Sequence, residues 1–168
     1  MPVHTTWDLG YNDSTAIWFF QQCGQEIHLL EYYDNSGEVL THYLHHLKSK
    51  PFIYGKHLVP HDAAVHEYSK GLSRVKVARN HVITFTIAPD IGINEGIDAA
   101  RSMLPRCWFD EEKCAKGISS LDNYKKQWND RQGFWSSHPL HNFASHGAGT
   151  FRMLAVGIGK LGSKGLSA

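Results

Sequence analysis

The spacing of apolar and polar positions along the chain predicts strands first, followed by strands mixed with helices. A short strand ends at Trp7-Asp8-Leu9-Gly10. Residues 14 to 33 are then rich in aromatic and β-branched side chains on both sides of the turn Cys23-Gly24-Gln25, a pattern typical of a hairpin. Beyond Asp34-Asn35-Ser36-Gly37, apolar residues recur at helical spacing from Val39 to Leu47, and Lys50-Pro51 ends this helix.

The remaining chain alternates between the two kinds of element. Short strands are predicted from Phe52 to Leu58, ended by Pro60, and from Ile83 to Ile87, ended by Pro89. Helical spacing predicts further helices over residues 73–79, 97–104, 118–128 and 142–155. This order of elements predicts an α/β fold in which α-helices flank a mixed β-sheet.

Length, composition and charge narrow the class of protein. A chain of 168 residues with 42% hydrophobic and 12% aromatic residues is long and apolar enough to fold as one domain. Its 17 Lys and Arg against 16 Asp and Glu leave a net charge of +1, so any contact with DNA must come from a local patch. No apolar run approaches the ~20 residues of a membrane span, and we expect no membrane partner.

Several familiar motifs are absent or incomplete. The three cysteines form no C-x-x-C pair, which argues against a disulfide framework and fits a reducing cytoplasm. Residues 157–162 match G-x-G-x-x-G, but no strand–helix–strand unit follows them. No Walker motif is present, so we expect no ATPase activity from this chain. We predict one domain over residues 1–156 and a flexible tail over 157–168.

Two aspartates follow predicted strands and are candidates for a metal site. Asp8 ends the first strand, and Asp62 lies just past the strand that ends near Leu58. If these strands are neighbours, the two carboxylates converge and repel each other unless a divalent cation lies between them. Oxygen ligands of this kind suit Mg²⁺ or Mn²⁺. Taken alone, both Asp8 and Asp13 more often serve as turn formers or helix caps, and Asp13 is the weaker candidate.

The twelve histidines raise the question of a zinc site. His138, His141 and His146 have a spacing that can bring two of them together where a loop enters a helix. No cysteine or second histidine pair completes a zinc pattern, so ordinary hydrogen-bonded histidines are the favoured interpretation. Cys107 and Cys114 are likewise expected to be small buried apolar residues.

A series of ordered segments resembles the nuclease domain of tailed-phage terminase large subunits, which are DNA-packaging motor proteins. The resemblance runs from about Trp7 to Ala155. It is carried by Trp7-Asp8-Leu9-Gly10 with Asp13-Ser14, by Val59-Pro60-His61-Asp62-Ala63, by residues 96–101 and 107–110, and by residues 141–148 with Phe151-Arg152. Each motif is weak alone, and their order makes them specific together.

The resemblance implies an RNase H-like fold and a metal-dependent endonuclease that cuts concatemeric viral DNA during packaging. Asp8 and Asp62 match the first two metal ligands, and an intact site would hold two Mg²⁺ or Mn²⁺ ions bridged by Asp8. Gly149 stands where the family has a third catalytic Asp, and a glycine supplies no ligand oxygen. His146, one helical turn earlier, either faces the same cleft or has a packing or capping role. Asp13 would contact the ligands rather than the ions.

The resemblance also implies partners. These are double-stranded DNA, the ATPase half of the same large subunit, the portal protein and the small terminase subunit. The implied location is the cytoplasm of a bacterial host. We expect the isolated domain to be a monomer. Local cations are expected to contact DNA phosphates, and the alternative is that they only form a solvated charged face. These cations are Arg74, Lys76, Arg79, Lys125 and Lys126.

Gly149 leaves a second function class open. Without the third ligand, the chain can instead be a catalytically inactive DNA-binding or motor-docking module. A third class, an unrelated hydrolase with a histidine-activated nucleophile, lacks a G-x-S-x-G elbow in this sequence.

Overall fold

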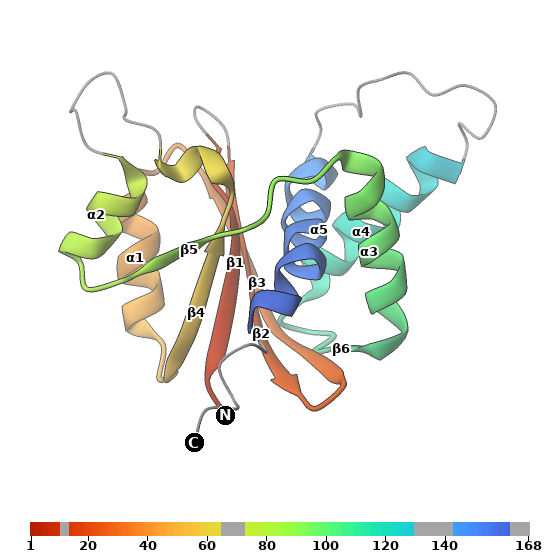
Figure 1. Ribbon diagram of the computed structural model, residues 1–168, viewed down its shortest axis with the longest axis horizontal. Helices are drawn as coiled ribbons and strands as arrows, with labels where there is room; N and C mark the ends of the chain where they lie inside the picture. The colour runs from red at the N-terminus through yellow and green to blue at the C-terminus, as the bar shows by residue number, and fades with distance from the viewer. Residues whose placement is uncertain (11–13, 65–72, 130–142, 162–168) are drawn as a thin grey trace.

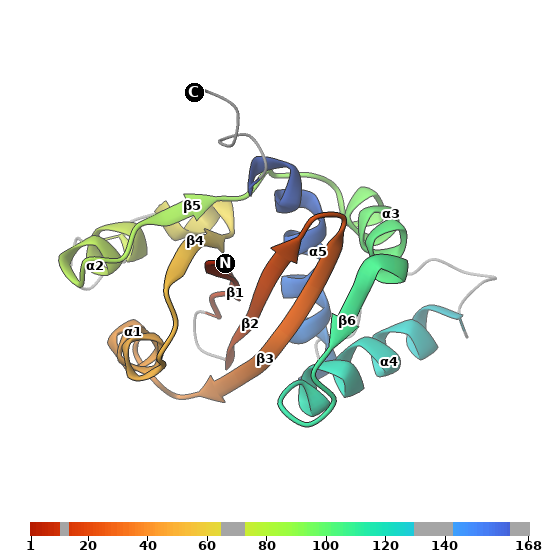
Figure 2. The same cartoon turned by 90° about the horizontal axis from the view of Figure 1, so that it is seen from below.

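One mixed β-sheet with helices on both faces forms the protein (Figures 1 and 2). The computed structural model describes residues 1–10, 14–64, 73–129 and 143–161. The strands are β1 (Val3–Asp8), β2 (Ser14–Cys23), β3 (Glu26–Ser36), β4 (Tyr54–Val59), β5 (Phe85–Ile87) and β6 (Cys107–Phe109). The helices are α1 (Leu40–Ser49), α2 (Arg74–Asn80), α3 (Ile93–Met103), α4 (Ala115–Asn129) and α5 (Phe143–Leu161), with 3₁₀ turns η1 (His61–Ala64) and η2 (Leu104–Arg106).

The strand order places β1 near the centre of the sheet. In the order β5-β4-β1-β2-β3-β6, strand β2 runs antiparallel to its neighbours β1 and β3, whereas the pairs β1–β4, β4–β5 and β3–β6 are parallel. The predicted mixed sheet is therefore confirmed. Because β1 and β4 are parallel neighbours, their carboxyl ends lie at the same edge of the sheet.

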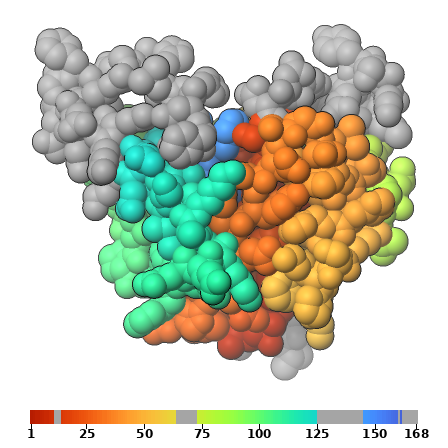
Figure 3. Space-filling model, turned by 180° about the vertical axis from the view of Figure 1, so that it is seen from behind, coloured from red at the N-terminus to blue at the C-terminus, as the bar shows by residue number. Residues whose placement is uncertain are grey.

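The hairpin predicted for residues 14 to 33 is present as β2 and β3. Cys23 pairs with Glu26, so the connection is a two-residue turn that begins at Gly24. Gly24 has a φ of 64°, a left-handed conformation that glycine adopts without steric cost. On the face of the molecule turned away in Figure 1, side chains of β3 lie between those of α1 and those of α4 (Figure 3).

Alternation along the central strands divides the core between the two faces of the sheet. Trp7, Ile17 and Phe19 are fully buried in the cluster that includes the apolar side of α1 and Ala78 of α2. Trp18 and Phe20, offset by one residue, are fully buried in the opposite cluster beneath α5. Both sets follow from the two-residue period of a strand that is covered on both faces.

Helix α5 packs directly on the centre of the sheet. The indole Nε1 of Trp18 donates to the carbonyl oxygen of Gly147 at 3.0 Å, and Thr6 Oγ1 donates to the carbonyl oxygen of Thr150 at 3.2 Å. Further along, a Cβ on Gly157 would lie only 2.7 Å from Leu58 Cδ1. Glycine permits this close crossing, because a side chain at 157 would force the fully buried Leu58 of β4 to shift.

The structure corrects the predicted end of the domain. Residues 157–161 belong to α5, so a flexible tail that begins at 157 is wrong for these five positions. The physical reason is that Leu154, Ile158 and Leu161 continue one apolar helical stripe, which packs against the core under α5. Residues 162–168 lie outside the described part of the chain.

A short strand that the sequence pattern did not predict completes the sheet. β6 has three residues, Cys107–Phe109, and pairs in parallel with β3. Cys114, just beyond it, is fully buried as expected of a small apolar residue, and burial raises the pKa of its thiol to about 12.

Within the described ranges, no helix combines the length and apolar character that a membrane crossing needs.

A buried histidine on β4 makes the stability of the sheet dependent on pH. His57 is 5% exposed, and its Nδ1 lies 2.7 Å from Thr5 Oγ1, which also accepts a hydrogen bond from Trp7 Nε1 at 2.7 Å. Burial, with a smaller contribution from nearby His4, lowers the pKa of His57 from 6.5 to about 4. The folded protein therefore keeps this imidazole neutral.

We predict that the free energy of unfolding decreases as the pH is lowered from 6.5 to about 4. In this window the unfolded chain binds a proton at His57 that the folded chain does not, at a cost of up to about 3 kcal/mol. The His57→Asn variant keeps a hydrogen-bonding group near Nδ1 but does not titrate, so its dependence should be shallower. Denaturant unfolding at several pH values measures this, and parallel curves for the two proteins would contradict it.

Candidate active site

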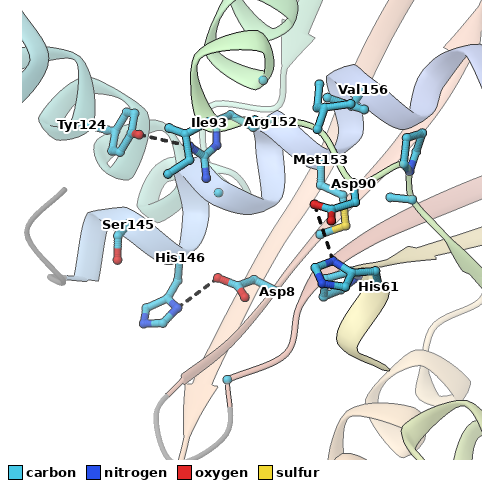
Figure 4. A pocket seen from close by; sticks show the side chains of 18 residues that line it. Asp8, His61, Asp90, Ile93, Tyr124, Ser145, His146, Arg152, Met153 and Val156 are labelled. Carbon is cyan, nitrogen blue, oxygen red and sulfur yellow. Dashed lines mark hydrogen bonds and ion pairs between the residues drawn. The ribbon is translucent and has the colours of Figure 1, made fainter. Parts of the chain in front are cut away.

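A cavity of about 640 Å³ opens beside the carboxyl end of β1, between the sheet and helices α3 and α5 (Figure 4). Its polar side chains come from several elements that are distant in sequence. They are Asp8, His61, Asp90, Tyr124, Ser145, His146 and Arg152. Gly149, the position of the expected third aspartate, also lines this cavity.

Asp8 and His146 are joined across the cavity wall (Figure 4). Asp8 Oδ2 lies 3.1 Å from His146 Nδ1, and the exposed fractions of the two side chains are 32% and 16%. An ionised carboxylate only accepts hydrogen bonds, so Nδ1 of His146 carries the proton. In the neutral imidazole this leaves the electron pair on Nε2, the atom able to bind a metal or accept a proton. His146 thus faces the cleft, one of the two roles considered for it.

The backbone accounts for this meeting of β1 and α5. Thr6 faces α5, where its hydroxyl binds the carbonyl of Thr150, and Asp8 has the same facing because strand residues alternate. Thr150 Oγ1 in turn donates to the carbonyl oxygen of His146 at 2.6 Å. The α5 segment that carries His146 is therefore fixed against the strand that carries Asp8.

Position 149 points at the same carboxylate. A Cβ built on Gly149 would lie 3.8 Å from Asp8 Oδ2 and 3.8 Å from Arg152 Nη2, and apart from its chain neighbours and the local helix backbone no atom of the described residues is closer. A side chain at this position is therefore accommodated, and it would enter the space between the Asp8 carboxylate and the Arg152 guanidinium. The role of position 149 as a third acidic position stays a prediction.

Sequence reasoning missed Arg152 and Tyr124 as residues of the cleft. Arg152 Nη1 donates to the hydroxyl oxygen of Tyr124 at 3.3 Å, and the guanidinium carbon lies 6.0 Å from the centre of the tyrosine ring (Figure 4). The signal was available, because Arg152 follows Gly149 by three residues in a predicted helix and so shares its face.

The structure places Asp62 at the same edge of the sheet as Asp8 but not in the cavity wall. Thr6 pairs with Leu58 in the β1–β4 ladder, and Asp62 follows β4 in the exposed turn η1. Its neighbour His61 lines the cavity instead, with Nδ1 3.8 Å from Asp90 Oδ1. Both partners of that pair are largely exposed, at 64% and 73%, so water weakens their attraction. Shared metal binding by Asp8 and Asp62 stays a prediction.

The described residues contain no group of three or more His, Cys, Asp and Glu side chains placed to hold one metal ion. Two pairs of such side chains meet in the cavity wall, Asp8 with His146 at 3.1 Å and His61 with Asp90 at 3.8 Å. His138 and His141, considered above for zinc, lie outside the described residues, as does Asp13.

The cations predicted to contact DNA have different positions. Arg74 is only 7% exposed, and its Nη1 donates to the carbonyl oxygen of Leu9 at 3.0 Å. It therefore supports the backbone just after Asp8, and the predicted phosphate contact is wrong for this residue because its guanidinium is buried. Lys76 and Arg79 are exposed on α2. Lys125 and Lys126 are on α4, and their side chains lie outside the described part.

Comparisons with known proteins give a structural relationship only. No protein-family model and no curated protein matches the chain. The large terminase of a thermophilic bacteriophage superposes with a TM-score of 0.69 and 14% identity over 96% of this chain. The nuclease domain of the bacteriophage SPP1 large terminase, solved with bound Mn, gives 0.68 and 11% over 95%, and that of P22 gives 0.64 and 17% over 95%. The chain has the RNase H-like fold of a large-terminase nuclease domain.

The extent of these matches separates the domain from the whole protein. The chain spans about 40% of the large terminase from the thermophilic phage but corresponds to 87% of the SPP1 nuclease domain chain and 82% of the P22 one. The terminase nuclease fold therefore accounts for nearly all of the described elements. It also agrees with the fold that the ordered sequence motifs implied.

We predict that Gly149→Asp strengthens Mn²⁺ binding, because the new carboxylate would lie next to Asp8. A roughly tenfold tighter site should raise the Tm at saturating Mn²⁺ by about 3–5 °C relative to the unchanged chain. Metal-dependent thermal melting measures this effect. Gly149→Asn has nearly the same shape without the charge and is the matched control. Equal Mn²⁺ responses of all three proteins would show that position 149 does not serve the metal site.

Proposed function

We propose that this chain is the nuclease domain of a tailed-phage terminase large subunit and cuts concatemeric viral DNA during genome packaging. The observation that carries the proposal is the convergence of Asp8, His146 and position 149 in one cleft of a terminase nuclease fold. The proposed class is a metal-dependent endodeoxyribonuclease. Its proposed location is the cytoplasm of the bacterial host.

The donor set fits a hard divalent cation. Mg²⁺ commonly binds through one or two carboxylates, while water and substrate phosphates complete its coordination shell. Asp8 provides one such carboxylate, and the cavity of about 640 Å³ beside it has room for the ion, water and a phosphate. Asp8 would hold the ion, with Asp62 at the same edge of the sheet and His146 beside it. Mg²⁺ or Mn²⁺, when bound, would activate water and neutralise charge on the phosphate. Two ions are expected of a complete site, and Gly149 removes a ligand from one of them.

The chain's own residues would then orient the reaction. His146 holds the Asp8 carboxylate in place through Nδ1, and its Nε2 can accept a proton. Arg74 fixes the backbone after Asp8 through the carbonyls of Leu9 and Gly10. DNA would be held by its phosphates with little sequence preference, since the chain has a net charge of only +1 and relies on local cations such as Lys76 and Arg79.

A second candidate is a catalytically inactive DNA-binding or motor-docking module. It is favoured by Gly149 and by the lack of a three-residue metal cluster among the described residues. Titration with Mn²⁺ together with a cleavage assay separates the two candidates, because a nuclease site retaining Asp8 takes up the ion and cuts DNA, whereas a docking module does not cut. Either function implies the same proposed partners: double-stranded DNA, the ATPase half of the large subunit, the portal protein and the small terminase subunit.

We predict that linear and supercoiled plasmid DNA are cut in Mg²⁺ or Mn²⁺ and not in excess chelator. Asp8→Asn should lower the cleavage rate by at least about 100-fold, because even residues that only support metal ligands cost 10–100-fold. Asp90→Asn, a carboxylate of the same cavity that is 73% exposed, is the matched control and should cut normally.

Undiminished cutting by Asp8→Asn, or cutting in chelator, would contradict the nuclease assignment. Mn²⁺ uptake without cutting by the unchanged chain would favour the inactive module. Gel electrophoresis of plasmid time courses provides the measurement.

A further inference from the structure

The contacts of Arg152 within the protein do not account for the position of its guanidinium. It lies on α5, lines the 640 Å³ cavity of the candidate site, and also reaches the neighbouring cavity between α3, α4 and α5. Gly96 of α3 lies against its aliphatic stem, since a Cβ there would be at an ordinary van der Waals distance of 3.4 Å from Arg152 Cδ. The stem is therefore enclosed by helices while the guanidinium reaches the cleft.

Tyr124 fixes the direction of this guanidinium. Nη1 donates to the tyrosine hydroxyl at 3.3 Å, and the positive charge lies 6.0 Å from the ring centre, within the range of a cation–π interaction. Nη2 is then the nitrogen turned towards position 149, where a Cβ would be 3.8 Å away. Figure 4 shows the guanidinium held by Tyr124 on the same side of the cavity as Ser145 and His146.

The charge of Arg152 has no counter-charge among the described carboxylates. The ion pairs of the described residues involve other side chains, and the Asp8 carboxylate is paired with His146 instead. A half-buried cation that lines an open cavity is placed to attract a negatively charged ligand. Arginine is well suited to phosphate, because its planar donors match the geometry of phosphate oxygens.

A carboxylate and a guanidinium border the space above Gly149. Asp8 Oδ2 and Arg152 Nη2 each lie 3.8 Å from the point that a Cβ at 149 would occupy. An aspartate at 149 would put its own carboxylate beside the guanidinium and neutralise it. Glycine leaves that guanidinium available to a negatively charged ligand that enters the cleft.

We propose that Arg152 binds a non-bridging oxygen of a DNA phosphate directly above Gly149, with Tyr124 as its positioning residue. This inference rests on the proposed function, because it assumes that the cleft receives DNA. It adds a substrate-binding residue that is independent of the metal ligands. Binding through Arg152 therefore does not require a divalent cation.

The test measures binding of a short random-sequence DNA duplex by fluorescence anisotropy in excess chelator over a series of salt concentrations. Arg152→Gln should weaken binding about tenfold at low salt and make the slope of log K against log salt shallower by about 0.9, the value for one lost phosphate contact. Arg152→Lys should restore the slope but only part of the affinity, because a lysine keeps the charge without the planar donors.

Two further variants control for charge and for folding. Arg106→Gln removes the same charge near the β2–β3 turn, where Arg106 Nη1 donates to the Gln25 carbonyl, and should leave the slope unchanged. Tyr124→Phe removes only the hydroxyl that orients Arg152, and should weaken binding by a smaller factor with the slope retained. Thermal melting of each variant verifies that it is folded.

The outcomes separate the inference from the proposed function. If the unchanged chain binds DNA and Arg152→Gln binds with equal affinity and slope, the inference fails and the proposed function stands. If Arg152→Gln and Arg106→Gln change binding equally, the contact is non-specific and the inference also fails. If the unchanged chain binds no duplex at any salt concentration, the proposed function fails and the inference fails with it.

Discussion

The close packing of α5 on β1 is the constraint on which the rest of the site depends. Thr6 and Trp18 of the sheet hydrogen-bond to carbonyl oxygens of α5, and these bonds fix the helix in both position and rotation. His146, position 149 and Arg152 occupy successive turns of one helix face, so one packing interaction sets all three against Asp8. A small rotation of α5 would remove them together.

The rest of the sheet supports that interaction from the opposite side. Trp7 is fully buried against the α1 layer and its indole nitrogen bonds to Thr5, which also contacts His57 of β4. Arg74 then holds the backbone beyond Asp8 through two carbonyl oxygens. The end of β1 is thus constrained by a buried polar network beneath it and a buried cation after it, which keeps a partly exposed carboxylate in a defined place.

Local sequence patterns predicted most elements, because the spacing of apolar residues and the Gly and Pro residues that end an element are local properties. The Gly24 hairpin, the helix ended by Lys50-Pro51 and the mixed sheet were all available from such signals. β6 was not predicted because three residues are too few to show a periodic pattern of apolar side chains. The end of α5 was misplaced because its glycines suggested a loop. The Arg152–Tyr124 contact joins helices 28 residues apart, which no local pattern reveals, and Arg74 was misjudged because burial of an arginine is a tertiary property.

Gly149 changes the charge balance of the cleft as well as its ligand count. Asp8 and an aspartate at 149 would repel each other unless a cation is bound, so such a site would depend on metal for its own stability. With glycine, the Asp8 carboxylate is compensated by its bond to His146, and Arg152 keeps a positive charge at the cleft that no described carboxylate compensates. Under the proposed function, glycine at 149 leaves out a metal-binding carboxylate and keeps the Arg152 cation available to a phosphate. In the proposed function, binding of DNA through Arg152 and cleavage at Asp8 and His146 therefore depend on different residues.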